Sequence, residues 1–527
     1  MIFRRLFPTR ESQRLPITDA RNAEGAPAYL RSPQAALAQY AATGCLGGTF
    51  YATAAEQLDR SLALAREVAQ EDPELCAKVA LWARRRGHMK DLPALLVAFL
   101  LVDHGELAAR IFDRVIDDGR MLRKFVQIVR SGAVGRRCFG TRPRRLIRQW
   151  LARRSDRELL FASIGEQPSL GDIVKLVHPK PESASRRALF GWLTGRDFVL
   201  DDAPLELRDF LAFLTVPGAE LPDVPFLMLS GRPLCTEHWR ALARRCTWQQ
   251  LRMNLNSFLR HGVFDDADTL DLCVERLRDP AEIAATRTFP YQFMTALDNL
   301  DDGMPEAIRV ALMEAIERAT LNVPALDGRV LVAVDVSGSM QSPISGRRGS
   351  ATSKVRCVDV AALFAATILR RNQAAQVLPF TSEVIPFSHD PEWTVAQLST
   401  ALAALPSGGT NCSAPLREWN RRRAGAELIV LISDNESWVD AGDGGRGTAT
   451  LAEWRVFRAR NRGSKLVCLD LQPSSTTQAR NEDAVLNVGG FSDAVFDLID
   501  GFARDGHRGA TWLDRIRALS LDATSVP

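Results

Sequence analysis

The hexapeptide Asp335-Val336-Ser337-Gly338-Ser339-Met340 follows the apolar run Val330 to Val334, and this stretch decides the fold of the C-terminal half. Such a run is typical of a strand that is buried on both faces of a sheet. Beyond it, one carboxylate and two hydroxyls occupy alternate positions, so their oxygens can converge on one point. Ligation by oxygen alone suits a hard divalent cation such as Mg²⁺. The stretch therefore predicts part of a metal site at a strand end.

Two later segments supply the ligand types that the hexapeptide lacks. Ser407 to Asn411 (SGGTN) offers a third hydroxyl, and Ile432 to Glu436 (ISDNE) offers a second carboxylate after another apolar run. The predicted metal ligands are Asp335, Ser337, Ser339, Thr410 and Asp434. Few carboxylates leave a cation under-neutralised, so a partner carboxylate or a nucleic-acid phosphate could complete its shell. No general base or nucleophile is evident beside these residues, which indicates binding rather than catalysis. The alternative is an intact fold with an empty or vestigial site.

Strands and helices alternate after Pro324. Strands are predicted at Arg329 to Val336, Ala375 to Phe380, Glu427 to Ile432 and Leu466 to Leu471, and helices at Lys354 to Arg371, Val395 to Leu405, Ala414 to Arg423, Thr450 to Arg460 and Phe491 to Ala503. This order predicts a doubly wound, Rossmann-like parallel sheet that is covered on both faces. Ligands bind beyond the carboxyl ends of such strands, where all three metal-site segments fall. The three segments together resemble the metal-ion-dependent adhesion site of a von Willebrand factor A (vWA) domain.

The first 320 or so residues follow a helical pattern that is interrupted by glycine or proline. Apolar residues recur three and four positions apart in Ala54 to Asp72. Further helices are predicted at Leu75 to Arg86, Leu92 to Val102, Leu107 to Ile116, Leu146 to Leu151 and Leu207 to Leu214. Consecutive short helices without strands predict stacked pairs, as in a HEAT-like α-helical repeat, although no fixed-period sequence repeat is visible. The two halves thus differ in class, with a boundary near 320–326.

Composition and length set broad limits. The 527 residues exceed a single core, and 46% apolar with 25% charged residues is typical of globular proteins. Nine cysteines without a CxxC pair argue against a zinc ribbon and against a disulfide framework. Met1 to Arg10 lacks the apolar core of a secretory signal, and Leu92 to Val102 is too short to span a bilayer. These features predict a cytoplasmic protein that has no membrane contact.

Charge is uneven along the chain although the net charge is only +4. Residues 121–160 carry twelve Lys or Arg and two acids, and a helix starting at Thr141 would place arginines opposite an apolar face. Guanidinium groups bind phosphates in bidentate fashion, so this segment predicts salt-dependent RNA or DNA binding. The predicted RNA-binding residues, which include a second basic patch around residue 178, are Arg136, Arg137, Arg142, Arg144, Arg145, Arg148, Lys175, His178 and Lys180. The alternative is a solvated arginine-rich face with a structural histidine.

A helical half followed by a vWA domain with DVSGSM, GGTNC and SDNES resembles the Ro autoantigen family, whose TROVE module binds Y RNA. Four N-terminal stretches extend the likeness, in the order of that family. They are Gly44 to Tyr51 (GCLGGTFY), the basic helix after Gly140, Asp172 to Pro181 (DIVKLVHPKP) and Arg287 to Gln292 (RTFPYQ). The resemblance covers roughly residues 30–505. By position, His178 matches the family's histidine associated with Y RNA binding, and Arg144 and Arg145 match basic positions of its RNA-binding surface.

The resemblance implies a domain plan and a set of partners. The plan is an N-terminal extension (1–29), a TROVE helical-repeat RNA-binding domain (30–322), a vWA domain (323–505) and a C-terminal tail (506–527). The helical repeats would close into a monomeric ring that the vWA domain joins end to end. Family members bind a Y-like small noncoding RNA on the outer surface and single-stranded ends of misfolded RNA in the central hole. In bacterial members, the Y RNA can tether polynucleotide phosphorylase, an exoribonuclease.

The sequence departs from the family at two places: Phe161 to Pro168 contains no Lys or Arg, and the loop Gln341 to Ser353 is longer than expected. The predicted function is that of a non-enzymatic RNA-binding ring in noncoding-RNA quality control and stress-related RNA turnover. The alternative is a protein-interaction adaptor, in which a Mg²⁺-dependent vWA site binds partner carboxylates and the helical half is a scaffold. A nuclease is disfavoured because the site has hydroxyl ligands and no paired carboxylates for two metals.

Overall fold

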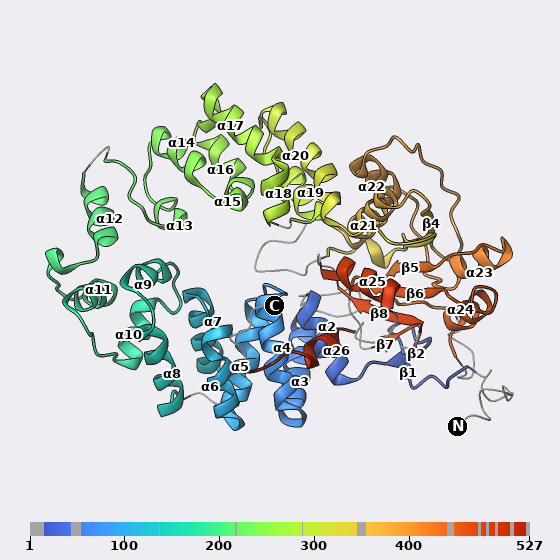
Figure 1. Cartoon of the computed structure of the whole chain (residues 1–527), viewed down its shortest axis with the longest axis horizontal. Coiled ribbons are helices and arrows are strands. Elements are labelled where there is room, and N and C mark those ends of the chain that lie inside the picture. Colours follow the sequence, from blue (N-terminus) through green and yellow to red (C-terminus); the bar gives the residue numbers. More distant parts are fainter. Residues whose placement is uncertain are drawn as a thin grey trace. The chain divides into compact units, whose positions relative to one another are not determined.

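A computed structural model describes residues 15–43, 54–135, 138–216, 219–286, 288–344, 355–439, 447–472, 476–480, 484–490, 494–505 and 511–522 (Figure 1). These residues form two compact units that do not follow the order of the chain. One unit draws on Met1–Ser61, Arg287–Thr295 and Met313–Arg515, and the other on Leu62–Thr286, Ala296–Leu312 and Ile516–Pro527. The first unit is built around a parallel sheet, and the second is helical.

The first unit contains a five-stranded parallel sheet in the order β4-β3-β5-β6-β8. Its strands are β3 (Val330–Asp335), β4 (Gln376–Phe380), β5 (Leu428–Ser433), β6 (Lys465–Asp470) and β8 (Val485–Gly489). All six residues of β3 and of β5 are buried, as expected for strands covered on both faces. The predicted doubly wound parallel sheet is confirmed, and β8 is a strand that the sequence pattern did not reveal.

Helices cover both faces of this sheet. On one face, Trp419 of α23 (Ala414–Arg421) and Trp454 of α24 (Ala449–Arg460) share a core with alternate residues of β3 and β5. Elsewhere in the unit, α21 (Cys357–Arg371) packs against β3 and also contacts α22 (Val395–Ala403). Phe364 of α21 stacks on Phe496 of α25 (Ala494–Asp505), with ring centroids 4.7 Å apart.

The N-terminal segment 20–43 also packs on the α/β unit. It forms β1 (Ala20–Arg21), β2 (Pro27–Leu30) and α2 (Pro33–Thr43), which packs against β8 and α25. Strand β2 pairs in antiparallel fashion with β7 (Thr476–Thr477), and buried Tyr29 joins the core that contains Trp419. Nothing in the local sequence pattern predicted this association, because the two strands are short and distant in the chain.

The helical unit begins within α3 and consists of consecutive short helices whose neighbours pack together, such as α4 on α5 and α5 on α6. From the N-terminal side they are α3 (Ala54–Glu71), α4 (Pro73–Arg85), α5 (Asp91–Asp103), α6 (Gly105–Val115), α7 (Gly119–Ser131), α8 (Thr141–Ala152), α9 (Asp156–Ala162), α10 (Leu170–Val177), α11 (Ala184–Thr194), α12 (Leu205–Thr215), α13 (Phe226–Leu229), α14 (Thr236–Arg245), α15 (Trp248–Met253), α16 (Leu255–Arg260), α17 (Ala267–Arg278) and α18 (Pro280–Thr286). The chain continues through α19 (Pro290–Asp298) and α20 (Glu306–Ala319), and α26 (Trp512–Arg517) follows α25. The helical class predicted for the N-terminal half is confirmed.

Two further expectations concern membranes and disulfides. None of the helices in the described ranges is both long and apolar enough to cross a membrane. Among the described cysteines no disulfide bond forms, and most of these thiols are buried.

Candidate functional sites

The first candidate site lies at the carboxyl ends of β3 and β5. Asp335 is the last residue of β3 and is fully buried, and Asp434 directly follows β5 with 3% exposure. The Ser337 N–H donates to Asp335 Oδ1 over 2.8 Å. Ser337 Oγ and Ser339 Oγ lie 3.2 Å apart. The hexapeptide therefore gathers the three predicted oxygen ligands at one strand end, as the alternate spacing predicted.

Hydrogen bonds connect this strand end to its neighbour. The Ser433 hydroxyl donates to Asp335 Oδ2 over 2.6 Å, and the Glu436 N–H donates to Asp434 Oδ1 over 3.2 Å. The second carboxylate oxygen, Asp434 Oδ2, is buried and accepts no hydrogen bond from the described residues. A buried oxygen without a donor is costly, so this atom is suited to a cation or to water.

The loop that carries Thr410 joins the other two segments through its backbone. The Gly338 N–H donates to the Gly408 carbonyl over 2.9 Å, and the Trp438 N–H donates to the Thr410 carbonyl over 3.2 Å. The Thr410 side chain is 5% exposed. All three predicted segments thus meet at one edge of the sheet, with the half-exposed Trp438 beside them.

The electrostatics of this edge favour an added positive charge. Burial raises the pKa of Asp335 to about 7, the nearby charge of Asp434 raises it further, and hydrogen bonds from Ser433 and Ser337 partly oppose the shift. Burial likewise raises the pKa of Asp434, although the Ser339 hydroxyl works in the opposite direction. Two buried carboxylates that repel each other, three hydroxyls and an oxygen without a donor form a donor set that fits a hard divalent cation.

The second candidate site lies on α8 in the helical unit. The predicted apolar face of this helix is buried at Leu146, Ile147, Trp150 and Leu151. Arg145 and Arg148 lie on the exposed side, as the helical spacing predicted. The helix begins at Thr141, where Gly140 provides no side-chain cap.

Arg148 connects α8 to the turn that follows α10. Its Nε donates to the Val177 carbonyl over 2.5 Å, at the end of α10. The next residue, His178, closes that helix in the left-handed region with φ of 48°, and its N–H donates to the Val174 carbonyl. The side chains of His178 and Lys180 are exposed. The two basic stretches singled out in the sequence therefore meet at Arg148.

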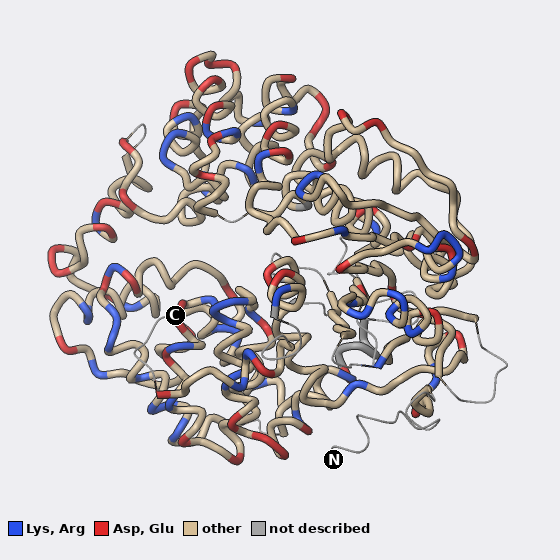
Figure 2. The backbone as a smooth tube through the Cα atoms, turned by 45° about the vertical axis from the view of Figure 1, so that its right-hand side comes forward, with Lys and Arg blue, Asp and Glu red and all other residues tan. Residues whose placement is uncertain are grey.

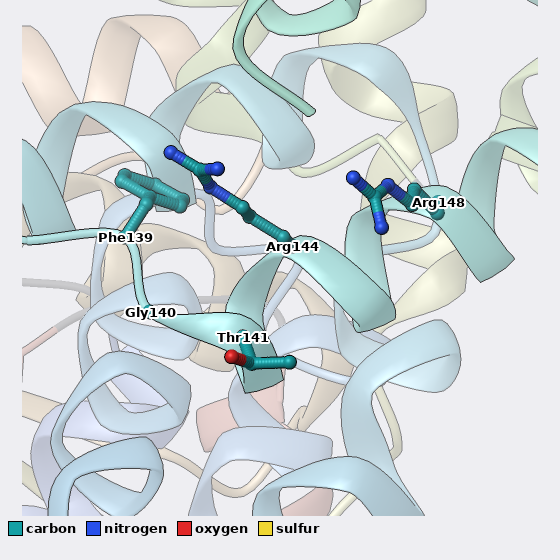
Figure 3. A pocket seen from close by; sticks show the side chains of 5 residues that line it. All are labelled: Phe139, Gly140, Thr141, Arg144 and Arg148. Atoms are coloured by element: carbon teal, nitrogen blue, oxygen red, sulfur yellow. The ribbon is translucent and has the colours of Figure 1, made fainter. Parts of the chain in front are cut away.

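Two adjoining hollows share Arg148 in their lining. The first has a volume of about 380 Å³ and is lined by Phe139, Gly140, Thr141, Arg144 and Arg148 (Figure 3). The second, of about 340 Å³, includes His178, Lys180 and Phe190 in its lining. Thus four of the predicted RNA-binding residues, Arg144, Arg148, His178 and Lys180, converge on one surface.

The remaining predicted RNA-binding residues lie elsewhere. Arg145 and Lys175 are exposed but line neither hollow. Arg142 lies against Gly105, where an added Cβ would come within 2.0 Å of the arginine Nη1. Arg136 and Arg137 lie outside the described residues, as do the Gly44 to Tyr51 stretch, Arg287 and most of the loop 341–353.

Ion pairing separates the structural arginines from the available ones. Arg153 pairs with Asp113, and Arg157 pairs with Asp223 over 2.7 Å. Arg154 covers the ring of Trp150 at 3.6 Å. Across the described ranges, by contrast, no ion pair involves Arg144, Arg145, Arg148, Lys175 or Lys180. Lys and Arg recur throughout both halves (Figure 2), so it is the gathering of four predicted residues around the two hollows, rather than basic residues as such, that marks the site.

Phe139 and Phe190 are the site residues that sequence reasoning missed. Phe139 directly precedes the glycine before the basic helix, which is the one local signal that could have drawn attention to it. Phe190 comes from α11, and only the packing of that helix beside α10 brings it to the second hollow.

The chain is similar to known proteins in its C-terminal domain and along nearly its whole length. Residues 329–503 match the family described as the Ro60 vWA domain. The chain is 27% identical over 530 residues to the RNA-binding protein RO60 of Deinococcus radiodurans, which covers 94% of this chain and 97% of that protein. It is 22% identical over 324 residues to the RNA-binding protein RO60 of Caenorhabditis elegans, covering 55% of this chain and 47% of that one.

A solved structure agrees with the architecture. The crystal structure of the D. radiodurans RO (RSR) protein matches with a TM-score of 0.65 and 24% identity, covering 90% of this chain and 99% of that one. At this identity the likeness supports the fold. The family resemblance that the motifs predicted is supported separately, by the vWA-domain match and by the full-length sequence match.

Proposed function

We propose that this chain, a member of the Ro family whose full-length likeness is to a bacterial protein, binds structured RNA through α8 and the turn after α10. The observation that carries the proposal is the convergence of Arg144, Arg148, His178 and Lys180 around two adjoining hollows. These guanidinium and ammonium groups form no ion pair within the described residues, so they are available for phosphates, and each such contact releases counterions. Both relatives carry the name RNA-binding protein, which supports the same partner class here.

The finer proposal follows the family. The ligand is a Y-like small noncoding RNA held on the outer surface of a monomeric ring, and single-stranded ends of misfolded RNA enter its central hole. The protein acts without catalysis in RNA quality control and stress-related turnover in the cytoplasm, and the RNA tethers polynucleotide phosphorylase. The support for these details is the resemblance along nearly the whole chain.

A divalent cation, which we propose to be Mg²⁺, would bind to Asp335, Ser337, Ser339, Thr410 and Asp434. The support is the buried pair of repelling carboxylates together with the donor-free Asp434 Oδ2. When bound, the cation would offer an open position to an oxygen ligand from a partner. The residues of this chain position the oxygens and exclude water from the strand ends, since both carboxylates are buried.

The test begins with the RNA that co-purifies with the protein. Sequencing should find one abundant stem-loop RNA, whereas bulk cellular RNA would contradict the proposal. The double variant His178→Ser with Arg145→Glu should weaken binding of that RNA while the circular dichroism spectrum stays unchanged. Arg208→Glu is the matched control, because Arg208 is an exposed arginine of α12 outside both hollows.

Salt dependence separates phosphate contacts from other modes of binding. Four to six phosphate contacts predict that the logarithm of affinity falls with the logarithm of salt at a slope of roughly −3 to −5. A filter-binding titration between 50 mM and 200 mM salt measures this slope. Affinity that does not change over this range would overturn the phosphate-contact account.

The adaptor alternative makes the opposite prediction. If the vWA site binds a partner carboxylate and the helical half is only a scaffold, Asp335→Ala should abolish capture of a protein partner while RNA binding of the wild-type protein is negligible. The RNA and protein that co-purify with wild-type protein and with Asp335→Ala therefore distinguish the two functions in one experiment.

A further inference from the structure

The turn between β1 and β2 lies against the loop that follows β5 and carries Asp434. Asn22 Nδ2 donates to the Ser437 carbonyl over 2.7 Å, and the Ala23 N–H donates to Glu436 Oε2, also over 2.7 Å. The partners of the second bond are 413 positions apart in the chain, so only the fold brings them together. The N-terminal segment is therefore anchored beside a predicted metal ligand.

The sequence builds this turn around Asn22, whose side chain is buried. Asn22 Oδ1 accepts the Ala26 N–H over 2.8 Å, and the Asn22 carbonyl accepts the Gly25 N–H over 3.0 Å. Gly25 has a φ of 78°, which lies in the left-handed region that favours glycine. Between these two residues Glu24 occupies the exposed tip of the turn. The asparagine and the glycine thus fix the backbone that presents this carboxylate.

Glu24 has no counter-charge among the described residues, since none of their ion pairs involves it. Its charge nevertheless acts on the metal edge of the sheet. Burial is the main cause that raises the pKa of Asp434, and the negative charge of Glu24 adds to the rise. Asp434 Oδ2 is also buried and accepts no hydrogen bond from the described part of the chain. A cation at this edge would relieve both the repulsion and the lack of a donor.

We propose that Glu24 is a carboxylate ligand that the chain itself supplies to the cation, so that the N-terminal turn occupies the position otherwise open to a partner oxygen. The inference rests on the divalent cation proposed above and adds one residue to its predicted ligands. Three of those ligands are neutral hydroxyls, so a further carboxylate would raise the affinity for the cation through its charge.

The proposal gives the site two states. With the turn docked, Glu24 fills the open position, and with the turn displaced, a carboxylate from a partner can take its place. A tethered ligand has an effective concentration on the order of millimolar, so a free carboxylate must exceed this to compete. The turn is therefore a built-in competitor for any protein that would bind at the vWA site.

Calorimetric titration of Mg²⁺ into the full-length chain tests the inference. Glu24→Gln keeps the backbone of the turn and removes the charge, so it should weaken Mg²⁺ binding about tenfold. Glu383→Gln is the matched control, because Glu383 is an exposed acid on the loop that follows β4. It should change the affinity by less than about twofold, as expected for a screened surface charge. Equal affinities of the wild type and Glu24→Gln would overturn the inference.

Acetate separates a ligand from a residue that only holds the turn in place. Glu24→Gln leaves the proposed position open, so added acetate should restore most of its lost Mg²⁺ affinity and leave the wild type unchanged. Asn22→Ala, which removes the hydrogen bonds that anchor the turn, should lose Mg²⁺ affinity and regain it with acetate in the same way. If acetate restores no affinity to Glu24→Gln, the carboxylate is not a ligand.

Hydrogen exchange locates the effect and keeps this inference apart from the proposed cation site. Mg²⁺ should slow amide exchange in residues 20–30 and 335–340 of the wild type, but only in 335–340 of Glu24→Gln. Slower exchange in 335–340 alone in the wild type would refute the role of Glu24 while the cation site stands. Absence of any Mg²⁺ binding to the wild type would refute both.

Discussion

The sheet edge and the α8 surface differ in the sign and in the burial of their charged side chains. Asp335 and Asp434 are withdrawn from water, repel each other and have raised pKa values. Arg145, Arg148 and Lys180 are exposed and form no ion pair within the described residues. A buried charge of this kind costs folding free energy until a counter-charge arrives, whereas an exposed charge costs little, and its attraction to a partner weakens as the ionic strength rises. The first region is therefore built for one fixed ion and the second for a mobile polyanion.

At the end of β6 in the same sheet, the chain supplies its own counter-charge for a buried carboxylate. Asp470 ends β6, fully buried, and Arg31 from the N-terminal segment reaches it with Nη2 at 3.4 Å from Oδ2. The sheet therefore contains one buried carboxylate, Asp470, that the protein pairs with its own arginine. The other two buried carboxylates, Asp335 and Asp434, are left for an external cation.

Breaking the pair of Arg31 and Asp470 should give the largest effect. Arg31→Ala leaves Asp470 buried without its cation, which typically costs about 3–5 kcal/mol of the free energy of unfolding. Urea unfolding measures the loss. Arg21→Ala, which removes only an exposed hydrogen bond to the Gly25 carbonyl, should change stability by under about 0.5 kcal/mol. Equal stability of the two variants would mean that the Arg31 pair does not hold the N-terminal segment.

Reversing charge on the α8 surface should affect binding rather than folding. Arg144→Glu together with Arg148→Glu should lower affinity for the co-purifying stem-loop RNA by more than about 100-fold, since each charged hydrogen bond contributes about 1.5–3 kcal/mol. The free energy of unfolding, measured with urea, should fall only by the loss of the Arg148 bond to Val177, roughly 1 kcal/mol. A large fall in the free energy of unfolding would contradict the view that Arg144 and Arg148 contribute little to the stability of the fold.

The pH dependence of stability tests the buried acids. The Asp335 pKa is about 7 in the folded chain and ~3.9 when unfolded, so the folded state binds more protons between these values. Stability in EDTA should therefore fall as the pH rises from 4 to 7, by on the order of 3 kcal/mol. Added Mg²⁺ should restore it at neutral pH, and Asp335→Asn should flatten both responses. A stability that rises over this pH range in EDTA would refute the buried-acid account.

The smallest expected effect on RNA affinity comes from removing a single exposed cation, Lys180. Lys180→Ala should weaken RNA binding about threefold and reduce the magnitude of the salt slope by about 1, because it removes one solvent-exposed phosphate contact. Filter binding at several salt concentrations measures both quantities. A tenfold loss at constant slope would indicate that Lys180 packs against the RNA rather than neutralising a phosphate.

The parts of the fold that were predictable are those with local signals. Val330–Asp335 and Leu428–Ser433 read as strands because continuous apolar runs are typical of buried parallel strands. Strand Val485–Gly489 was missed because Asn487 and Gly489 interrupt the apolar pattern. The pairing of β2 with β7 joins segments too distant and too short for any pattern to reveal.

The residues of the candidate sites also differ in whether a local sequence signal revealed them. Two of the three predicted metal-site segments directly follow β3 and β5 in sequence, whereas Ser407 to Asn411 lies between α22 and α23 and reaches the same edge of the sheet only through the fold. The arginines of 121–160 looked alike in the sequence, since the partners that occupy Arg153 and Arg157 are Asp113 and Asp223, far along the chain. Only the fold separates the arginines that hold helices together from those that remain available.

The contact between Arg31 and Asp470 has a consequence for synthesis on the ribosome. The two residues are 439 positions apart in the chain. At a translation rate of ~5–20 residues per second, the N-terminal segment waits roughly 20–90 seconds for its partner to emerge. During that interval Tyr29 and the edge of β2 are exposed to solvent and to chaperones. A chain that has not been extended past Asp470 can never make this contact, so closure of the segment reports that synthesis has passed that residue.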